Sequence, residues 1–221
     1  MRTLLHKYKH AWVFLYAFIY FPWFCYLEKN VTNEFHIIHT ALDEKIPFVE
    51  LFVIPYLLWF GFITFAALYF FFTDQTGFYR MAAFMITGMT VFLIISTIYP
   101  NGQILRPTEF ARDNIFVDMV RHLYEGDTPT NIFPSIHAYN SIGVHLAVRN
   151  SERLKKNRLA QHGTFVLSVL IILSTMFLKQ HSILDVIGAI VLAVPAYYLA
   201  YVWEPKGAHA YKKASNIKNY T

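Results

Sequence analysis

The chain has 221 residues, of which 56% are apolar and 18% aromatic, whereas charged residues account for only 15%. This composition excludes an ordinary soluble domain and indicates an integral membrane protein. The net charge of +5 does not indicate a nucleic-acid partner, because the basic residues are spread along the flanks of the apolar segments.

Five apolar runs are each close to the roughly 20 residues that are needed to cross the core of a bilayer. They occupy about 11–27, 50–72, 81–99, 164–178 and 183–203. The first run follows a basic N-terminus, but no small-residue cleavage site follows it, so we expect a retained span and not a signal peptide. A sixth and weaker segment, 134–148, is interrupted by polar residues and must be buried among the other helices in order to cross the membrane.

The distribution of lysine and arginine supports six spans. If the N-terminus is cytoplasmic, thirteen of the 19 basic residues lie on the inner side, including Arg2, the loop at 149–158 and the basic tail after Trp203. Without the fourth span, the basic loop would share a side with the acidic residues of the loop before it. The sequence therefore predicts one all-α, polytopic membrane domain over residues 1–221, with six transmembrane helices and both termini cytoplasmic.

The outer loop at 100–133 is too long to be a simple connection, and loops of this length usually have a function or carry local structure. Between Asn114 and Glu125, apolar residues recur at helical spacing. We expect a short amphipathic helix that lies on the membrane surface. A plain surface helix without a role at the lipid is an equal alternative.

Ionisable residues from distant parts of the chain meet at the outer ends of the predicted spans. Arg106 follows the third span, His137 opens the fourth and His181 opens the sixth. His181 and Asp185 are four residues apart, so they can touch if they lie in the first turn of a helix. A carboxylate orients an imidazole and stabilises its cationic form, which suits a nucleophilic or acid/base histidine. The alternative is a buried ion pair that only ties helices together.

Three blocks resemble the signature of the membrane type 2 phosphatidic acid phosphatase superfamily. They are Arg106-Pro107, Pro134-Ser-Ile-His137 and His181-Ser-Ile-Leu-Asp185. They follow the family patterns Lys-x6-Arg-Pro, Pro-Ser-Gly-His and Ser-Arg-x5-His-x3-Asp in the same order. Together with the six-span layout, the resemblance covers nearly the whole chain.

The resemblance implies a role for each block. His181 is then the nucleophile that accepts a phosphoryl group, Asp185 orients it, and His137 protonates the departing oxygen and later activates water. Arg106 and the backbone amides near Ser135 and Ile136 would hold the phosphate. A phosphate ester needs several donors around its oxygens, and no metal is obligatory if cations neutralise the charge.

Three positions depart from the family patterns. Tyr99, Ile136 and Thr175 stand where the family has lysine, glycine and arginine, so two phosphate-binding cations are missing. Similar departures occur in the branch that resembles inositol phosphorylceramide synthases, which transfer a phosphoryl-bearing group to a lipid alcohol. The acceptor, water or an alcohol, is therefore left open.

Other residues near the outer ends of the spans are candidates to replace the missing charges. Lys179, two residues before His181, is the first candidate for binding phosphate, and its alternative role is that of a snorkelling interfacial lysine. Arg112 in the neighbouring loop is a weaker candidate. Gln180 is a candidate donor to phosphate only because it is adjacent to His181 in the sequence.

We therefore expect a lipid phosphatase of the cell membrane, which hydrolyses a phosphate or diphosphate head group at the outer leaflet through a phosphohistidine. It would need no metal or other cofactor and no nucleic-acid partner. A lipid phosphotransferase is the main alternative. Two further hypotheses are a metal site of His137, His181 and Asp185, which the charge of Arg106 opposes, and a non-catalytic transport or structural protein.

Overall fold

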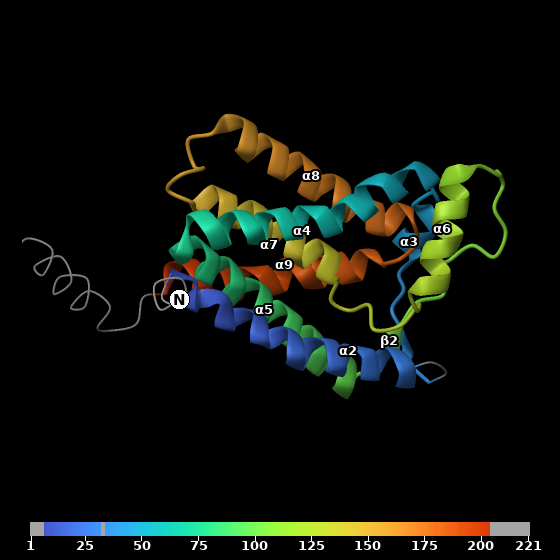
Figure 1. Cartoon of the computed structure of the whole chain (residues 1–221). Helices are drawn as coiled ribbons and strands as arrows, with labels where there is room; N and C mark the ends of the chain where they lie inside the picture. Colours follow the sequence, from blue (N-terminus) through green and yellow to red (C-terminus); the bar gives the residue numbers. More distant parts are fainter. Residues whose placement is uncertain (1–6, 32–33, 204–221) are drawn as a thin grey trace, which may run out of the picture.

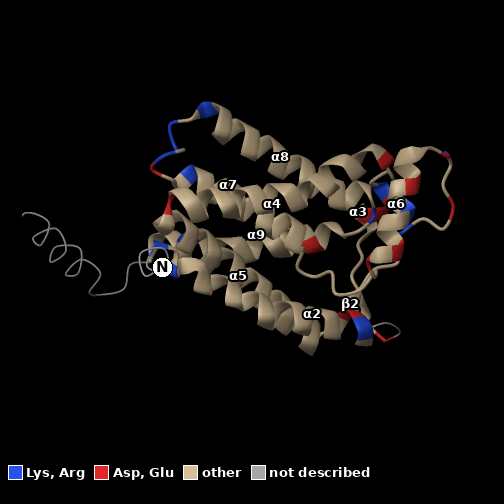
Figure 2. Ribbon diagram, viewed as in Figure 1, with Lys and Arg blue, Asp and Glu red and all other residues tan. Residues whose placement is uncertain are grey.

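The computed structural model describes residues 7–31 and 34–203, so the predictions for Arg2 and for the tail after Trp203 fall outside the described residues. Long helices lie alongside one another in a bundle, and short elements gather at one end of it (Figure 1). Charged residues lie mainly at the two ends of the bundle, whereas the helices between them are almost free of charge (Figure 2). This distribution is typical of a protein whose middle layer lies in hydrocarbon.

Five helical stretches are long and apolar enough to cross a membrane, and each overlaps one of the five predicted runs. Among the described residues they are Lys9–Asn30, made of η1 (Lys9–Tyr16) and α2 (Ala17–Asn30); Glu50–Thr73, made of η2 (Glu50–Phe52) and α4 (Val53–Thr73); α5 (Gln75–Ile98); α8 (Arg158–Phe177); and Ile183–Val202, made of α9 (Ile183–Tyr197) and η3 (Tyr198–Val202). The chain is thus a multi-pass membrane protein.

Helices α5 and α8 each begin six residues before the predicted boundary. Polar caps explain the difference, because the side chain of Asp74 accepts a hydrogen bond from the amide of Gly77, and that of Asn157 accepts one from Ala160. Hydropathy detects the apolar part of a helix and misses the polar first turn that such a cap starts.

Helix α7 (Ile136–Asn150) occupies the predicted fourth span, and its 15 residues are fewer than those of the five long stretches. It packs against α5, α8 and α9, so that Asn140 and Ser141 are buried. The backbone carbonyl of Ser141 accepts a hydrogen bond from the hydroxyl of Ser168 in α8, at 2.9 Å. The polarity that weakens the sequence signal therefore lies inside the bundle, and a sixth membrane crossing stays a prediction.

Helices α5 and α7 approach closely because each places a glycine against an aromatic ring of the other. A Cβ atom at Gly88 would lie 2.1 Å from the ring of Tyr139, and one at Gly143 would lie 2.8 Å from the ring of Phe84. The two rings stack with their centroids 4.5 Å apart, and the hydroxyl of Tyr139 donates to the carbonyl of Phe84 at 2.8 Å. This contact fixes the position of α7, the helix that carries His137.

The end of the bundle nearest the predicted outer loop is built from short elements. They are β1 (His36–Ile37), α3 (Ala41–Lys45), β2 (Asn101–Gly102) and α6 (Ile115–Gly126), and β1 pairs with β2 in parallel. Helix α6 starts one residue after the predicted Asn114, because Asn114 is its N-cap. Its buried residues Val117 and Val120 face the bundle, and α6 contacts η2 and α4. Its position at a membrane surface stays a prediction.

The described chain begins and ends at the opposite end of the bundle from α6, where the connection between α7 and α8 also lies (Figure 1). An even number of crossings would produce this arrangement. The cytoplasmic assignment of that end rests on the charge distribution and stays a prediction.

Candidate active site

His181 and Asp185 meet at the N-terminus of α9. Ser182 is the N-cap of this helix, and its amide donates to the Asp185 carboxylate at 2.8 Å. The same carboxylate oxygen lies 3.2 Å from Nδ1 of His181. The four-residue spacing therefore does bring the two side chains together, although His181 precedes the helix and is not part of its first turn. Because Asp185 engages Nδ1, the Nε2 side of the ring is left for a reactant.

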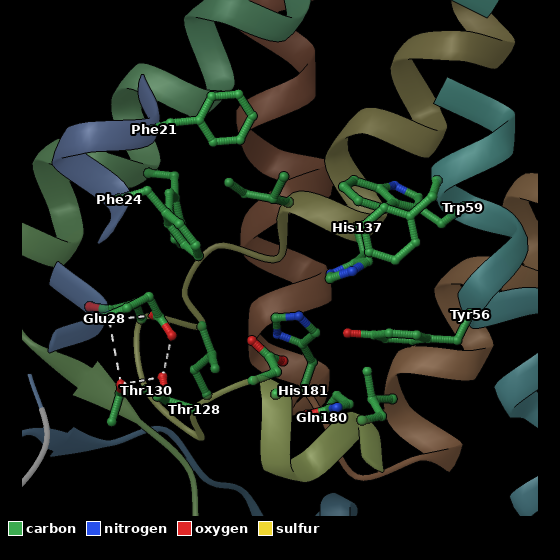
Figure 3. A pocket seen from close by; sticks show the side chains of 18 of the residues that line it. Phe21, Phe24, Glu28, Tyr56, Trp59, Thr128, Thr130, His137, Gln180 and His181 are labelled. Atoms are coloured by element: carbon green, nitrogen blue, oxygen red, sulfur yellow. Dashed lines mark hydrogen bonds between the residues drawn. The ribbon is translucent and has the colours of Figure 1, made fainter. Parts of the chain in front are cut away.

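His137 lies opposite His181, in the first turn of α7. The centroids of the two imidazoles are 5.7 Å apart, and Figure 3 shows the rings facing one another. His137 packs against Tyr56 and Trp59 of α4, with ring centroids 4.7 and 4.4 Å away. Burial lowers the pKa of His181 to about 3, and the charge of Arg106 adds to the shift. His181 is therefore neutral at pH 7, the form in which a nitrogen can act as a nucleophile.

Both histidines line a cavity of about 450 Å³. Much of the cavity lining is aromatic and comes from α2, α4 and α5, namely Tyr20, Phe21, Phe24, Tyr56, Trp59, Phe60 and Phe92. Phe21 and Phe60 also expose 60% and 56% of their surface on the outside of the bundle. The cavity therefore extends from the histidines towards a surface that lipid would cover.

Another part of the cavity lining is polar and acidic. Glu28, near the end of α2, accepts a hydrogen bond from the hydroxyl of Thr128 at 2.5 Å (Figure 3). It accepts a second one from the side-chain amide of Asn131 at 2.8 Å. Asp127 also lines this side, and burial raises its pKa to about 6, against the opposing effect of Arg106 and with a further contribution from Glu28. A phosphate in the cavity must therefore be bound by donors on other sides.

Arg106 lies behind the cavity wall and is not among the residues that line the cavity. Its guanidinium donates to the carbonyls of Tyr124, Asp127 and Thr128, at 3.3, 2.7 and 3.2 Å, and to the side-chain oxygen of Gln180. It also stacks on the ring of Tyr124, with Cζ 4.6 Å from the centroid. Burial lowers the pKa of Arg106 and Asp127 counteracts this shift. A guanidinium keeps its positive charge in proteins.

Ser135 and Ile136 form the start of α7. Ser135 is a buried N-cap whose hydroxyl accepts from the amide of Ala138 at 3.3 Å, and its own amide donates to the carbonyl of Asp185 at 3.0 Å. Ile136 lines the cavity. The first amides of a helix have no acceptor within the helix, so the start of α7 offers backbone donors to an anion beside His137.

Neither Lys179 nor Arg112 lies beside His137 and His181. Lys179 has a φ of 53°, in the left-handed region, and its ammonium donates to the carbonyls of Asp43, at 2.7 Å, and Ile46. Arg112 forms an ion pair with Glu50 at 3.1 Å. The expectation that Lys179 binds phosphate is therefore not met, because the turn at the end of α8 directs its side chain towards α3.

Asp43 is a site residue that sequence analysis did not identify. It is buried, and it accepts hydrogen bonds from the hydroxyl of Ser182 at 2.7 Å and from the amide of Ile183 at 2.8 Å. A second carboxylate thus supports the start of α9, beside His181. Its signal in the sequence was the pair Thr40 and Asp43, whose spacing is that of a capping box.

Glu28, Asp127, Tyr56 and Trp59 were also missed. Glu28 carried a signal, since a carboxylate near the end of an apolar span is unusual. The two aromatic residues gave none, because aromatic residues are common throughout the spans.

The arrangement of the polar groups bears on the metal hypothesis. In the described parts of the chain, no group of three or more His, Cys, Asp and Glu side chains is arranged to hold a metal ion. Asp185 points to His181 and to the amide of Ser182, so it does not share a centre with the two histidines.

Comparison with known proteins agrees with the resemblance seen in the sequence. Residues 100–208 match the family model described as the PAP2 superfamily, and this range contains Arg106, His137, His181 and Asp185. Neither the curated proteins nor the solved structures contain a match. The match to this superfamily supports a phosphatase-type or related function that handles lipid phosphates. Residues 100–208, which hold all three signature blocks, are thus the PAP2 superfamily region of this chain.

Proposed function

We propose that the protein hydrolyses the phosphate or diphosphate head group of a lipid at the outer leaflet, through a phosphohistidine and without a metal. The observation that carries this proposal is the cavity itself. It joins a neutral histidine held by a carboxylate, a second histidine opposite and an aromatic side open to lipid. A water-soluble phosphate ester would not need the aromatic side.

Nε2 of His181 attacks the phosphorus atom, a P–N bond forms, and the P–O bond to the lipid breaks. Asp185 accepts the Nδ1–H and stabilises the positive charge that develops on the ring. His137 takes up a proton as the anionic head group binds beside it, and gives this proton to the departing oxygen. In the second step His137 takes a proton from water, the water oxygen attacks phosphorus, and inorganic phosphate leaves His181 as a neutral imidazole.

The charge of the phosphoryl group is met by donors on the histidine side of the cavity. The start of α7 supplies backbone amides beside His137. Arg106 contributes its positive charge from behind the wall, at a depth where burial weakens the screening by water. The acidic side of the cavity keeps the phosphate near the histidines, because it repels an anion.

The exposed aromatic residues support a lipid as the substrate. Phe21 of α2 and Phe60 of α4 both line the cavity and lie on the outside of the bundle. An acyl or isoprenoid chain could therefore stay in the membrane while its head group reaches His181. The outer leaflet follows from the predicted topology, which puts the short elements and the site at the outer end.

A lipid phosphotransferase is the second candidate, and the polar side of the cavity favours it. The side-chain oxygen of Asn131 is buried and has no partner among the described residues, and Glu28 lies next to it. Both are acceptors, so they suit the hydroxyl of an alcohol. In this reaction the oxygen of the alcohol, and not of water, attacks the phosphohistidine.

The test is release of inorganic phosphate from lipid phosphates and diphosphates by the purified protein in detergent with a chelator. We expect turnover that His181→Ala abolishes and that His137→Ala lowers by roughly 10²- to 10⁴-fold. His145→Ala is the matched control, since His145 lies in α7, binds Thr164 and does not line the cavity. Turnover that needs a divalent ion would favour the metal hypothesis.

A lipid alcohol added to the same assay separates the two candidates. Formation of a new phospholipid at the expense of free phosphate identifies a transferase. No turnover with any lipid phosphate, with or without the alcohol, would contradict both and favour a non-catalytic role.

A further inference from the structure

The two missing family cations leave the phosphate site short of donors. Tyr99, at the position of the family lysine, stacks on His36 with centroids 4.1 Å apart. Thr175, at the position of the family arginine, is buried, and its hydroxyl donates to the carbonyl of Ile172. Neither residue lines the cavity, so another residue must complete the site.

Gln180 lies where such a donor is needed. It precedes His181, lines the cavity and has only 2% of its surface exposed. Figure 3 shows it directly beside His181 at the polar end of the cavity. Its Nε2 atom is buried and has no hydrogen-bond partner among the described residues. A buried amide donor without a partner is rare in a folded protein, and this one belongs to a residue that lines the cavity.

The contact with Arg106 fixes the orientation of this amide. A guanidinium has only donors, so the atom of Gln180 that faces Arg106 must be the oxygen. The NH2 group is then the other in-plane arm of the amide, and it is not the group that contacts Arg106. Because a cation binds its oxygen, the amide is polarised and its N–H groups become stronger donors.

The backbone holds Gln180 in place as well. Helix α8 ends at Phe177, and after the left-handed Lys179 the amides of Gln180 and His181 both donate to the carbonyl of Thr175, at 2.9 and 3.0 Å. The nucleophile and the neighbouring amide are therefore fixed by one turn.

We propose that Gln180 binds the phosphoryl group: its Nε2 donates to a non-bridging oxygen while His181 attacks the phosphorus atom. Arg106 is then a positioning residue, which holds the oxygen of Gln180 and polarises its amide. The assignment rests on the proposed function. It explains how a chain without the family lysine and arginine still offers a polarised donor beside its nucleophile.

Gln180→Glu is the sharpest variant to test this role. The carboxylate keeps the shape of the side chain and the bond to Arg106, but it presents an acceptor where the amide presents a donor. Gln180→Met removes the donor without adding a charge. Gln103→Glu is the matched control, because Gln103 is also buried, its Nε2 donates to the carbonyl of Lys179 at 3.0 Å, and it does not line the cavity.

Inorganic phosphate is the probe, and its binding to the full-length protein in detergent is measured by calorimetry beside the thermal midpoint of each variant. We expect Gln180→Glu and Gln180→Met to weaken phosphate binding by about 10- to 100-fold, the range for losing a hydrogen bond to a charged group. The same loss should appear in kcat/KM for the lipid phosphate. Gln103→Glu should lower the thermal midpoint and leave phosphate binding within about threefold of the unsubstituted protein.

Arg106→Lys tests the positioning role, since lysine keeps the charge but not the planar fork. We expect weaker phosphate binding in this variant, and little further loss when it is combined with Gln180→Met, because both changes act through one donor. Additive losses would show that Arg106 acts on phosphate independently of Gln180 and would contradict its positioning role.

Phosphate binding does not require turnover, so this experiment is separate from the test of the proposed function. A protein that binds phosphate but releases none from lipids would contradict the proposed function, and the Gln180 variants would still decide the assignment of the anion site. The assignment is overturned if the Gln180 variants bind phosphate as the unsubstituted protein does, if Gln103→Glu loses as much affinity, or if the unsubstituted protein binds no phosphate.

Discussion

Asp127 makes the charge of the cavity depend on pH. Burial raises its pKa to about 6, so the side chain is neutral below pH 6 and negative above it. The negative form lies on the wall of a cavity that we expect to bind phosphate, and it repels the substrate. Lowering the pH through 6 should therefore improve substrate affinity, and raising it should weaken affinity.

The prediction is tested with Asp127→Asn, which keeps position 127 neutral at every pH. Between pH 5 and pH 7, the KM of the unsubstituted protein should rise relative to that of the variant by roughly fivefold, for a charge interaction of about 1 kcal/mol. Titration of the substrate is common to both proteins and cancels in the ratio. Asp113→Asn, an exposed carboxylate paired with Arg121, should leave the ratio flat. A flat ratio for Asp127→Asn would rule out this effect.

Lys179 is the residue at which sequence and structure disagree most. Lys179→Met removes an ammonium that donates to the carbonyls of Asp43 and Ile46, in a group whose pKa burial lowers. We expect a loss of about 1–3 kcal/mol in stability and a KM for the lipid phosphate within about twofold of the unsubstituted protein. Thermal midpoints measure the loss of stability, and steady-state kinetics measure KM. A rise in KM without destabilisation would show that Lys179 binds the phosphate after all.

The sequence predicted contacts between residues within one turn, but it could not predict contacts between residues that are far apart in the chain. The pair His181 and Asp185 follows from spacing alone. The direction of Lys179 depends on the left-handed turn after α8, which no residue near it signals, because glycine and not lysine is the usual choice there. Adjacency to His181 marks Gln180 in the sequence, but its contact with Arg106, 74 positions earlier, is visible only in the folded chain.

At the scale of the elements, α5 and α7 pack closely through Gly88 and Gly143. Gly88→Ala would place a Cβ atom 2.1 Å from the ring of Tyr139, which α7 cannot avoid without moving. We expect a loss of about 1–3 kcal/mol from overpacking, together with lower turnover, because α7 carries His137. The thermal midpoint in detergent and the rate of phosphate release measure the two effects.

Gly61→Ala is the control for this change. A Cβ atom there would lie 3.7 Å from the ring of Phe65, an ordinary contact, in the middle of α4. Alanine should be neutral or stabilising by up to about 1 kcal/mol at such a helical position. Equal destabilisation by both substitutions would mean that the approach of α5 to α7 is not what limits stability.

Helix positions were predictable from hydropathy, and helix starts were not. The apolar runs locate the five long stretches, because they must face lipid over their whole length. Asp74 and Asn157 start α5 and α8 earlier with polar caps, which look like loop residues in a hydropathy pattern. Helix α7 gave the weakest signal because other helices surround it and its polar residues need not face lipid.

For the whole molecule, the topology is the prediction with the widest consequence. Cysteines at Glu109 and Lys155, both exposed and at opposite ends of the bundle, should react with an impermeant reagent from opposite sides of the membrane. The background needs Cys25→Ser, because Cys25 is exposed. We expect Glu109→Cys to be labelled in intact cells and Lys155→Cys only after permeabilisation. Labelling of both in intact cells would contradict the six-span topology.

The central claim is that His181 carries the phosphoryl group during the reaction. Rapid acid-free quenching of the protein with a radiolabelled lipid phosphate, followed by peptide mapping, tests it directly. The account predicts acid-labile label on the peptide that contains His181, the same label in His145→Ala, and no label in His181→Ala. Label that persists in His181→Ala, or full turnover by that variant, would contradict it.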